Sequence, residues 1–334
     1  MIKPFSMRDY FLAVTLEKQG TALDLEERLI HPLSPLRSAM LARLLPVAAG
    51  AATYILNFSD ESGVHQGMAQ AQIRPGRPEQ DVVFIAPSLE QGDGSHALWQ
   101  RMLTHLCVKA GESGHQRIYA RLNNDGDEAQ IFRNIGFGAY AEELIFQLSG
   151  DSCINSNAVS LVLRRQIAAD SWSVQRLYVA ATPRAVQVAE GLAQEQWQAK
   201  SRSFDNQGRR YGYVWEDQGE ILAVINVHSG KLGHWLKMMV HPDVNQEASR
   251  LISAGLKLIR GSRQRPVYCS LRSYQLELSA SLEDCGFQQF ARQVVMVKHN
   301  TVRAKDFLNR LVLPFEGAVE VKRASPTMVK SEQS

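Results

Sequence analysis

A glycine-bearing turn, residues 91–96, is the part of the sequence whose residue types best suit the binding of a ligand. It reads Gln-Gly-Asp-Gly-Ser-His and stands between an apolar segment ending at Pro87 and a segment with helical periodicity. Free N–H groups at a helix start favour an anion, and glycine lets an anion approach the backbone closely. A polar turn that simply leads into a helix explains the same residues equally well. The turn therefore predicts an anion site only if the fold places it at the start of a ligand-binding helix.

Other residues that could do chemistry form no pattern of a metal or catalytic site. The four cysteines, Cys107, Cys153, Cys269 and Cys285, have no metal-ligand spacing. Neither do His65, His96, His105 and His115. Cys107 and Cys269 lie in a helical and a strand pattern, which predicts buried thiols. Glu142 and Glu143 are expected to be a solvated pair at a strand start. We therefore predict no metal and assign no general base.

The elements that must position the turn occur twice along the chain. An apolar strand, a helix, a strand, a helix and a Gly-Phe pair follow one another in each half. The offset is 155 between Pro87 and Pro242, 149 between Tyr119 and Tyr268, and 150 between Gly136 and Gly286. A nearly constant offset indicates duplication. It predicts two domains, 1–150 and 157–300, with a polar linker at 149–156 and an extension, 301–334, whose end is expected to be disordered.

Each copy is predicted to start with helices and a hairpin. The expected hairpin strands are Thr53–Phe58 with Gln66–Ile73, and Tyr211–Trp215 with Ile221–Val227. The expected helical regions are Met7–Gln19, Glu26–Leu45 and Pro183–Lys200. Each Gly-Phe pair is predicted to end a helix, with the glycine in the left-handed conformation that closes the last turn.

Composition limits the class of protein. Of the 334 residues, 45% are apolar and 21% are charged, and 37 basic against 34 acidic side chains give a net charge of +3. Binding to nucleic acid or to a membrane surface needs clustered Lys and Arg, which this balance does not indicate. No secretory signal is recognisable, because charged residues interrupt the first apolar residues. We expect a soluble cytoplasmic protein.

The order of these elements resembles the GCN5-related N-acetyltransferase (GNAT) superfamily, here as a tandem pair covering residues 50–148 and 170–298. The most specific matches are Met239–Val244 and the two Gly-Phe pairs. The resemblance implies an α/β (α+β) fold, in which each domain has a mixed, mostly antiparallel central sheet flanked by helices. It also implies that acetyl-coenzyme A binds with its pyrophosphate on the amides at the start of the central helix.

Carried over residue by residue, the resemblance places the cofactor in the first copy. The predicted cofactor-binding residues are Ile85, Ala86, Gln91, Gly92, Gly94, Ser95, His96, Asn123 and Phe132. The turn departs from the family pattern because His96 stands where Gly or Ala is usual, and because Glu90 and Asp93 add negative charge. In the second copy, residues 245–248 replace the glycine-rich turn with Asn-Gln-Glu-Ala, so that copy is predicted to have lost the cofactor.

The family position of a proton-donating Tyr is filled by Phe132 in the first copy and by Leu282 in the second. Neither side chain can donate a proton. Two interpretations therefore stay open. The protein is an N-acetyltransferase that acts on the amine of a small molecule or peptide, or it is an inactive relative that binds a ligand or protein. Either a monomer with pseudo-dimeric halves or a homodimer is compatible with the tandem.

Overall fold

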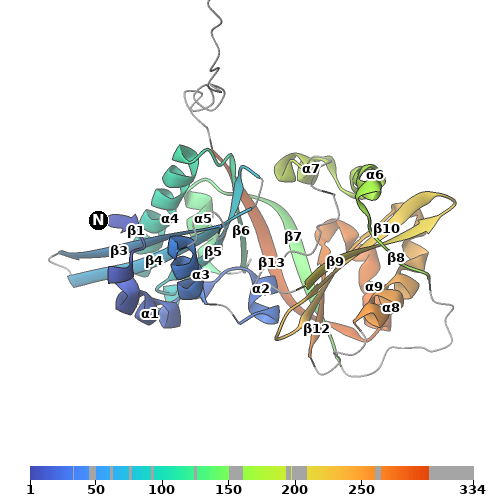
Figure 1. Cartoon of the computed structure of the whole chain (residues 1–334), viewed down its shortest axis with the longest axis horizontal. Helices are drawn as coiled ribbons and strands as arrows, with labels where there is room; N and C mark the ends of the chain where they lie inside the picture. Colours follow the sequence, from blue (N-terminus) through green and yellow to red (C-terminus); the bar gives the residue numbers. More distant parts are fainter. Residues whose placement is uncertain are drawn as a thin grey trace, which may run out of the picture.

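The computed structural model describes residues 1–32, 34–44, 50–60, 63–74, 77–91, 94–123, 126–149, 161–192, 197, 209–259 and 265–300. Their strands form one sheet that runs through both halves of the molecule (Figure 1). The strand order is β1-β3-β4-β5-β6-β13-β7-β12-β11-β10-β9-β8, and β2 pairs with β5 beside this path. The fold is therefore mixed α/β with a mostly antiparallel sheet, as predicted. Among the described helices, none is both long and apolar enough to cross a membrane.

The elements of the two halves follow the predicted repeat. The first half contains β1 (Ile2–Pro4), α1 (Tyr10–Gln19), β2 (Thr21–Ala22), α2 (Leu25–Ile30), α3 (Pro35–Leu44), β3 (Ala51–Asp60), β4 (Gly63–Ile73), β5 (Glu79–Ala86), α4 (Ser95–Glu112), β6 (Arg117–Asn123), α5 (Asp127–Asn134) and β7 (Gly138–Leu148). The second contains β8 (Arg164–Arg165), α6 (Ser171–Ala181), α7 (Arg184–Glu190), β9 (Arg209–Asp217), β10 (Glu220–Ser229), β11 (His234–Val240), α8 (Ala248–Leu258), β12 (Val267–Arg272), α9 (Ser279–Asp284) and β13 (Phe287–His299).

Local sequence explains where several helices end. Gly136 and Gly286 follow α5 and α9 with φ of +91° and +83°, which confirms the left-handed helix ends. The predicted helical region Glu26–Leu45 contains two helices, α2 and α3. His31 ends α2 in an extended conformation, as expected of a residue that precedes a proline.

The two halves exchange their last strands. β7 belongs to the first copy in sequence, yet it pairs with β12 of the second copy, and β13 pairs with β6 of the first. β13 also pairs with β7 along the whole of β7, and together the two strands cross the middle of the molecule (Figure 1). The predicted boundaries follow the repeat in sequence, whereas in space each half of the sheet takes one strand from the other copy.

A local two-fold axis relates the halves. Glu143 of β7 pairs directly with Gln293 of β13, and 150 residues separate them, as 150 separate Gly136 and Gly286. In an antiparallel pair, corresponding residues face each other only where a two-fold axis passes between the strands. The skipped positions in this ladder, Tyr140 and Phe290, also differ by 150. The tandem therefore has the internal symmetry of a homodimer.

Both cores depend on the exchange. The first-half core under α4 and α5 contains Val294 and Met296 from β13, and the second-half core under α8 and α9 contains Leu144 and Phe146 from β7. The opposite face of the sheet packs against α1 and α3 in the first half and against α6 in the second. The predicted thiols Cys107 and Cys269 are buried, as expected.

Candidate functional site

The predicted cofactor site lies where β5 and β6 part. The two parallel strands are paired only from Glu79 to Asp81 on β5, opposite Arg117 to Tyr119 on β6. Beyond that fork the strands diverge toward Ile85 and Ala86 on one side and Asn123 on the other. We call this opening the first gap. Ile85 and Ala86 are fully buried, backbone and side chain alike.

The first gap already contains a segment of this chain. In β2, Thr21 pairs with Ile85 and Ala22 with Phe84. The next residue, Leu23, donates its N–H to the carbonyl oxygen of Val83 at 3.0 Å. β4 pairs with the opposite edge of β5, so β2 occupies the edge that faces β6. A ligand that needs this backbone edge can bind only after β2 has moved.

At the mouth of the first gap, α4 begins with an open first turn. A Cβ added to Gly94 would meet nothing within 4 Å, and the N–H groups of the following residues precede the first intrahelical bond, from Leu98 to Gly94. Ser95 is buried, whereas His96 is half exposed and its Nε2 lies 3.5 Å from Asp127 Oδ2. This turn could hold an anion. Gly92, Asp93 and the side chain of Gln91 lie outside the described residues.

One of the remaining predicted positions, Phe132, has no surface that a ligand could reach. The side chain of Phe132 is fully buried and packs edge-on against Phe137, with ring centroids 4.9 Å apart. This corrects the prediction that Phe132 contacts a cofactor, because the ring fills the core between α4, α5 and the sheet. Leu282 is fully buried at the corresponding place in the second half. Asn123 is exposed at the end of β6, and its alternative, Asn124, lies outside the described residues.

The second half has a corresponding gap, which side chains close. β11 and β12 pair from His234 to Lys237 and then part. The amide group of Gln275 bridges them, since its Nε2 donates to the Met238 carbonyl at 3.1 Å and its Oε1 accepts the Arg272 N–H at 3.2 Å. At the mouth, Asn245 Nδ2 donates to Glu277 Oε2 at 2.6 Å. The prediction that this half lacks a cofactor stays a prediction, and its gap offers no open backbone edge at Met238.

A buried ion-pair network starts at the first fork. Arg74 donates to both carboxylate oxygens of Asp81, each at 2.6 Å. Burial alone would raise the pKa of Asp81, but the hydrogen bonds and charge of Arg74, with that of Arg121, hold it below its usual range. Arg121 Nη1 also lies 3.2 Å from Asp24 Oδ2. The network therefore ties the fork to the residue that follows β2.

The network continues to the two-fold axis. Gln293 Nε2 donates to Glu143 Oε2 at 2.6 Å, and the guanidinium groups of Arg121 and Arg272 lie 3.7 and 4.0 Å from the same carboxylate. Burial raises the pKa of Glu143, but the charges of Arg272, Lys237 and Arg121 and the Gln293 bond outweigh it and hold the pKa at about 2. The expectation of a solvated Glu142–Glu143 pair is therefore wrong for Glu143. The offset of 150 to Gln293 is the signal that could have revealed its place.

Helix α2 crosses from the first fork to the second half. Lys237, at the second fork, donates to Glu26 Oε2, and His228 Nδ1 donates to Glu26 Oε1 at 2.9 Å. Burial raises the pKa of Glu26, but Lys237 and His228 outweigh it and hold the pKa well below its usual range. His31 Nε2 lies 3.1 Å from His228 Nε2, and Arg210 donates to Glu27 at 2.7 Å. The helix is thus fixed by charge to strands of the other copy.

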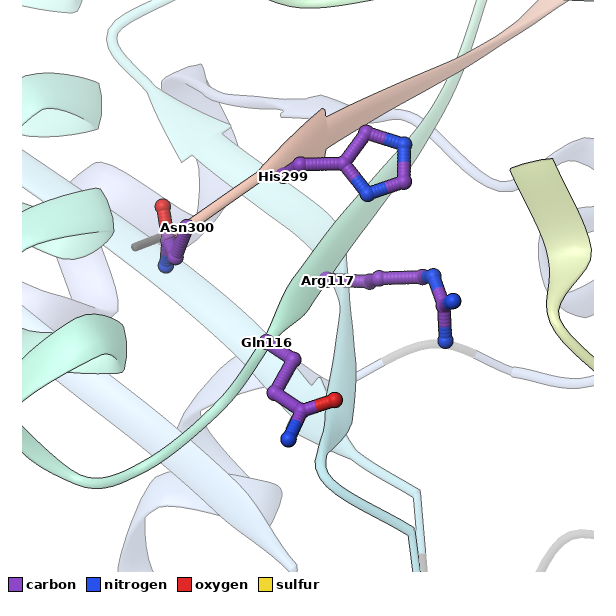
Figure 2. A pocket seen from close by; sticks show the side chains of 4 residues that line it. All are labelled: Gln116, Arg117, His299 and Asn300. Atoms are coloured by element: carbon purple, nitrogen blue, oxygen red, sulfur yellow. The ribbon is translucent and has the colours of Figure 1, made fainter. Parts of the chain in front are cut away.

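A cavity of about 290 Å³ lies away from the first gap. Its lining residues are Gln116, Arg117, His299 and Asn300, and the first three side chains point to the same side (Figure 2). Arg117 begins β6, whereas Asn123 ends it, so the cavity is at the opposite end of the strand from the predicted cofactor residues. No cluster of three or more His, Cys, Asp or Glu side chains able to hold a metal occurs in the described part of the chain.

Comparisons with known proteins identify the fold. No protein-family model matches the sequence, and no curated protein matches it. A GCN5-related N-acetyltransferase from Sphaerobacter thermophilus superposes with a TM-score of 0.52 at 12% identity, covering 90% of this chain and 95% of that one. A tandem GNAT protein from the clavulanic acid biosynthesis pathway superposes with a TM-score of 0.51 at 14% identity, covering 90% and 98%.

Proposed function

Because the chain has the tandem fold of the GCN5-related N-acetyltransferases, we propose that it is an acetyl-coenzyme A-dependent N-acetyltransferase with its cofactor site in the first half. The acceptor is the amine of a small molecule or peptide. The observation that supports this most is the parting of β5 and β6 just before a helix start that is open at Gly94. The second half, whose gap is closed by side chains, has a structural or acceptor-shaping role.

The residues present fit the pyrophosphate of the cofactor better than its acyl-carrying arm, because β2 occupies the place of the arm. The first-turn amides of α4, at Ser95 and His96, would hold the pyrophosphate, since they lack intrahelical partners and carry the positive end of the helix dipole. The β5 edge at Ile85 would hold the acyl-carrying arm once β2 has left it. When bound, acetyl-coenzyme A would supply a thioester: the amine nitrogen would bond to its carbonyl carbon, the carbon–sulfur bond would break, and the proton lost by the nitrogen would pass through water to the departing thiolate. The protein then contributes chiefly alignment of the amine and the carbonyl carbon.

Calorimetric titration with acetyl-coenzyme A tests the site. We expect one binding site per chain, and we expect Gly94→Glu to weaken binding by about tenfold or more, because it sets a carboxylate beside the phosphate-binding amides. Thr104→Glu adds the same charge to an exposed position further along α4, and its dissociation constant should match that of the wild type. Equal weakening by both variants would place the cofactor elsewhere.

A second function is favoured by two specific observations. β2 occupies the first gap, and the fully buried Phe132 and Leu282 stand where the family has a proton donor. An inactive relative that binds a ligand or protein partner would retain the fold with these features. Release of free thiol from acetyl-coenzyme A in the presence of an amine panel separates the two functions. Turnover above the buffer rate that Gly94→Glu abolishes would exclude the inactive relative, whereas binding without turnover would support it.

A further inference from the structure

We propose that residues 19–23, here called the plug segment, are an internal inhibitor of the first gap that must leave before acetyl-coenzyme A can bind. The inference rests on the proposed function and concerns the regulation of that site. Thr21 and Ala22 extend the sheet as a strand on the β5 edge that faces β6. Leu23 donates its N–H to Val83, and Ser88 donates its N–H to the Gln19 carbonyl at 2.7 Å. The segment thus takes the backbone contacts that a ligand in the gap would need.

The plug segment fits because its side chains are small where it enters the gap. A Cβ added to Gly20 would collide with the ring of Phe84 and would lie 2.8 Å from the Cβ of Ala86. Both neighbours are buried, so they have little room to move. Leu23, at the other end, is buried in the first-half core and favours the closed arrangement. A single glycine therefore controls how closely the segment can approach β5.

The ion-pair network allows the plug segment to leave without leaving the buried guanidinium group of Arg121 unpaired. Asp24 accepts the Glu26 N–H at the start of α2 and pairs with Arg121. Arg121 retains Asp81 and Glu143, whose oxygens lie 3.8 and 3.7 Å away, when Asp24 departs. The exposed β5 edge, by contrast, would be left with unpaired backbone groups until a ligand replaced β2. Opening and ligand binding are therefore coupled.

The second half controls the plug segment through α2. Glu26 is held by Lys237 and His228 on strands of the second half, and only Asp24 and Leu25 separate it from Leu23. Any change that loosens α2 from β10 and β11 should favour the open arrangement. This gives the second half a role in acetyl transfer that needs no cofactor of its own.

The extent of inhibition can be measured from the apparent dissociation constant of acetyl-coenzyme A. The apparent dissociation constant of a ligand is the intrinsic constant divided by the fraction of molecules in the open arrangement, so a protein that is about 1% open binds about a hundredfold more weakly. Gly20→Ala should raise that fraction by pushing the segment off β5. We expect it to bind acetyl-coenzyme A at least about tenfold more tightly than the wild type, with faster hydrogen exchange at the Leu23 amide. Gly111→Ala, where the added Cβ lies 3.8 Å from its nearest neighbour, is the matched control.

The outcomes separate the two proposals. Equal affinity in the wild type and Gly20→Ala, with the Leu23 amide equally protected with and without ligand, overturns the plug and leaves the cofactor site intact. No binding by Gly20→Ala, although its Leu23 amide exchanges freely, overturns the cofactor site and the plug with it. If Gly20→Ala does not fold, Glu26→Gln, which weakens the ion pair with Lys237 without touching the gap, must raise affinity in the same direction. Unchanged affinity in Glu26→Gln, despite faster exchange at the Leu23 amide, overturns the plug.

Discussion

A fragment of residues 1–150 will not form a stable monomer, although the sequence repeat marks it as a domain. It lacks β13, so β6 loses its antiparallel partner and keeps only the short pairing with β5, and the first-half core loses Val294 and Met296. Burial of two such side chains is worth about 3–6 kcal/mol, against a total stability of about 5–15 kcal/mol for a typical domain. The exposed edges of β6 and β7 should make the fragment associate. Size-exclusion chromatography with light scattering should show a dimer or aggregates.

Two further experiments make this test specific. Co-expression of 1–150 with 157–334 should give a 1:1 complex, because each fragment supplies the strand that the other lacks. In the intact chain, a protease site placed between residues 150 and 157 is the matched control, and cleavage there should leave the halves associated. A monomeric 1–150 fragment with a cooperative melting transition would show that the first copy does not need β13 in order to fold.

Glu143→Gln will lower the free energy of unfolding by about 3 kcal/mol at neutral pH. The change leaves Arg121 and Arg272 without the buried carboxylate between them, and removal of one partner from a buried ion pair costs about 3–5 kcal/mol. Because the folded protein holds the pKa of Glu143 at about 2, below the ordinary value of 4.5, the carboxylate stabilises the fold above about pH 4.5. That contribution is lost as the pH falls toward about 2.

Urea unfolding of the wild type and Glu143→Gln at several pH values checks both the size and the sign. The difference in free energy should be constant above about pH 4.5 and should shrink below it. Glu142→Gln is the control, since Glu142 neighbours Glu143 on β7 and is only partly buried, and its effect should be small at every pH. A difference that grows as the pH falls would show that Glu143 is not held ionised by Arg121 and Arg272.

The sequence predicts the features that depend on neighbouring residues and the features that recur in both copies. The hairpins, the helix ends at Gly136 and Gly286 and the doubling of the unit follow from periodicity, glycine conformation and the constant offset. The predicted helical region Glu26–Leu45 is divided into two helices, because the proline after His31 ends α2 there. The position of the first gap and of the α4 start also follows from the order of the elements, since both depend on where one strand ends and the next helix begins.

The rest depends on contacts between segments far apart in the chain. Offsets show that β7 and β13 are equivalent, but equivalent strands can close their own sheet or each other's, and no local signal separates the two arrangements. β2 is only two residues long, Thr21 and Ala22, too short to show a strand pattern. Glu143 follows another glutamate, which predicts a solvated position, and only its pairing with Gln293 explains its burial.

The two-fold axis between Glu143 and Gln293 bears on how the chain could have arisen and diverged. In a homodimer, a residue on the two-fold axis contacts the same residue of the other subunit. Any substitution there occurs in both subunits, so the new side chain must be compatible with a second copy of itself. Two buried glutamates in that position would repel each other. Once the two subunits are joined in one chain, the axial positions can mutate separately. The Glu143–Gln293 pair, the different residues at the two equivalent bulges (Tyr140 and Phe290) and the unequal gaps are the asymmetry that such a gene fusion permits.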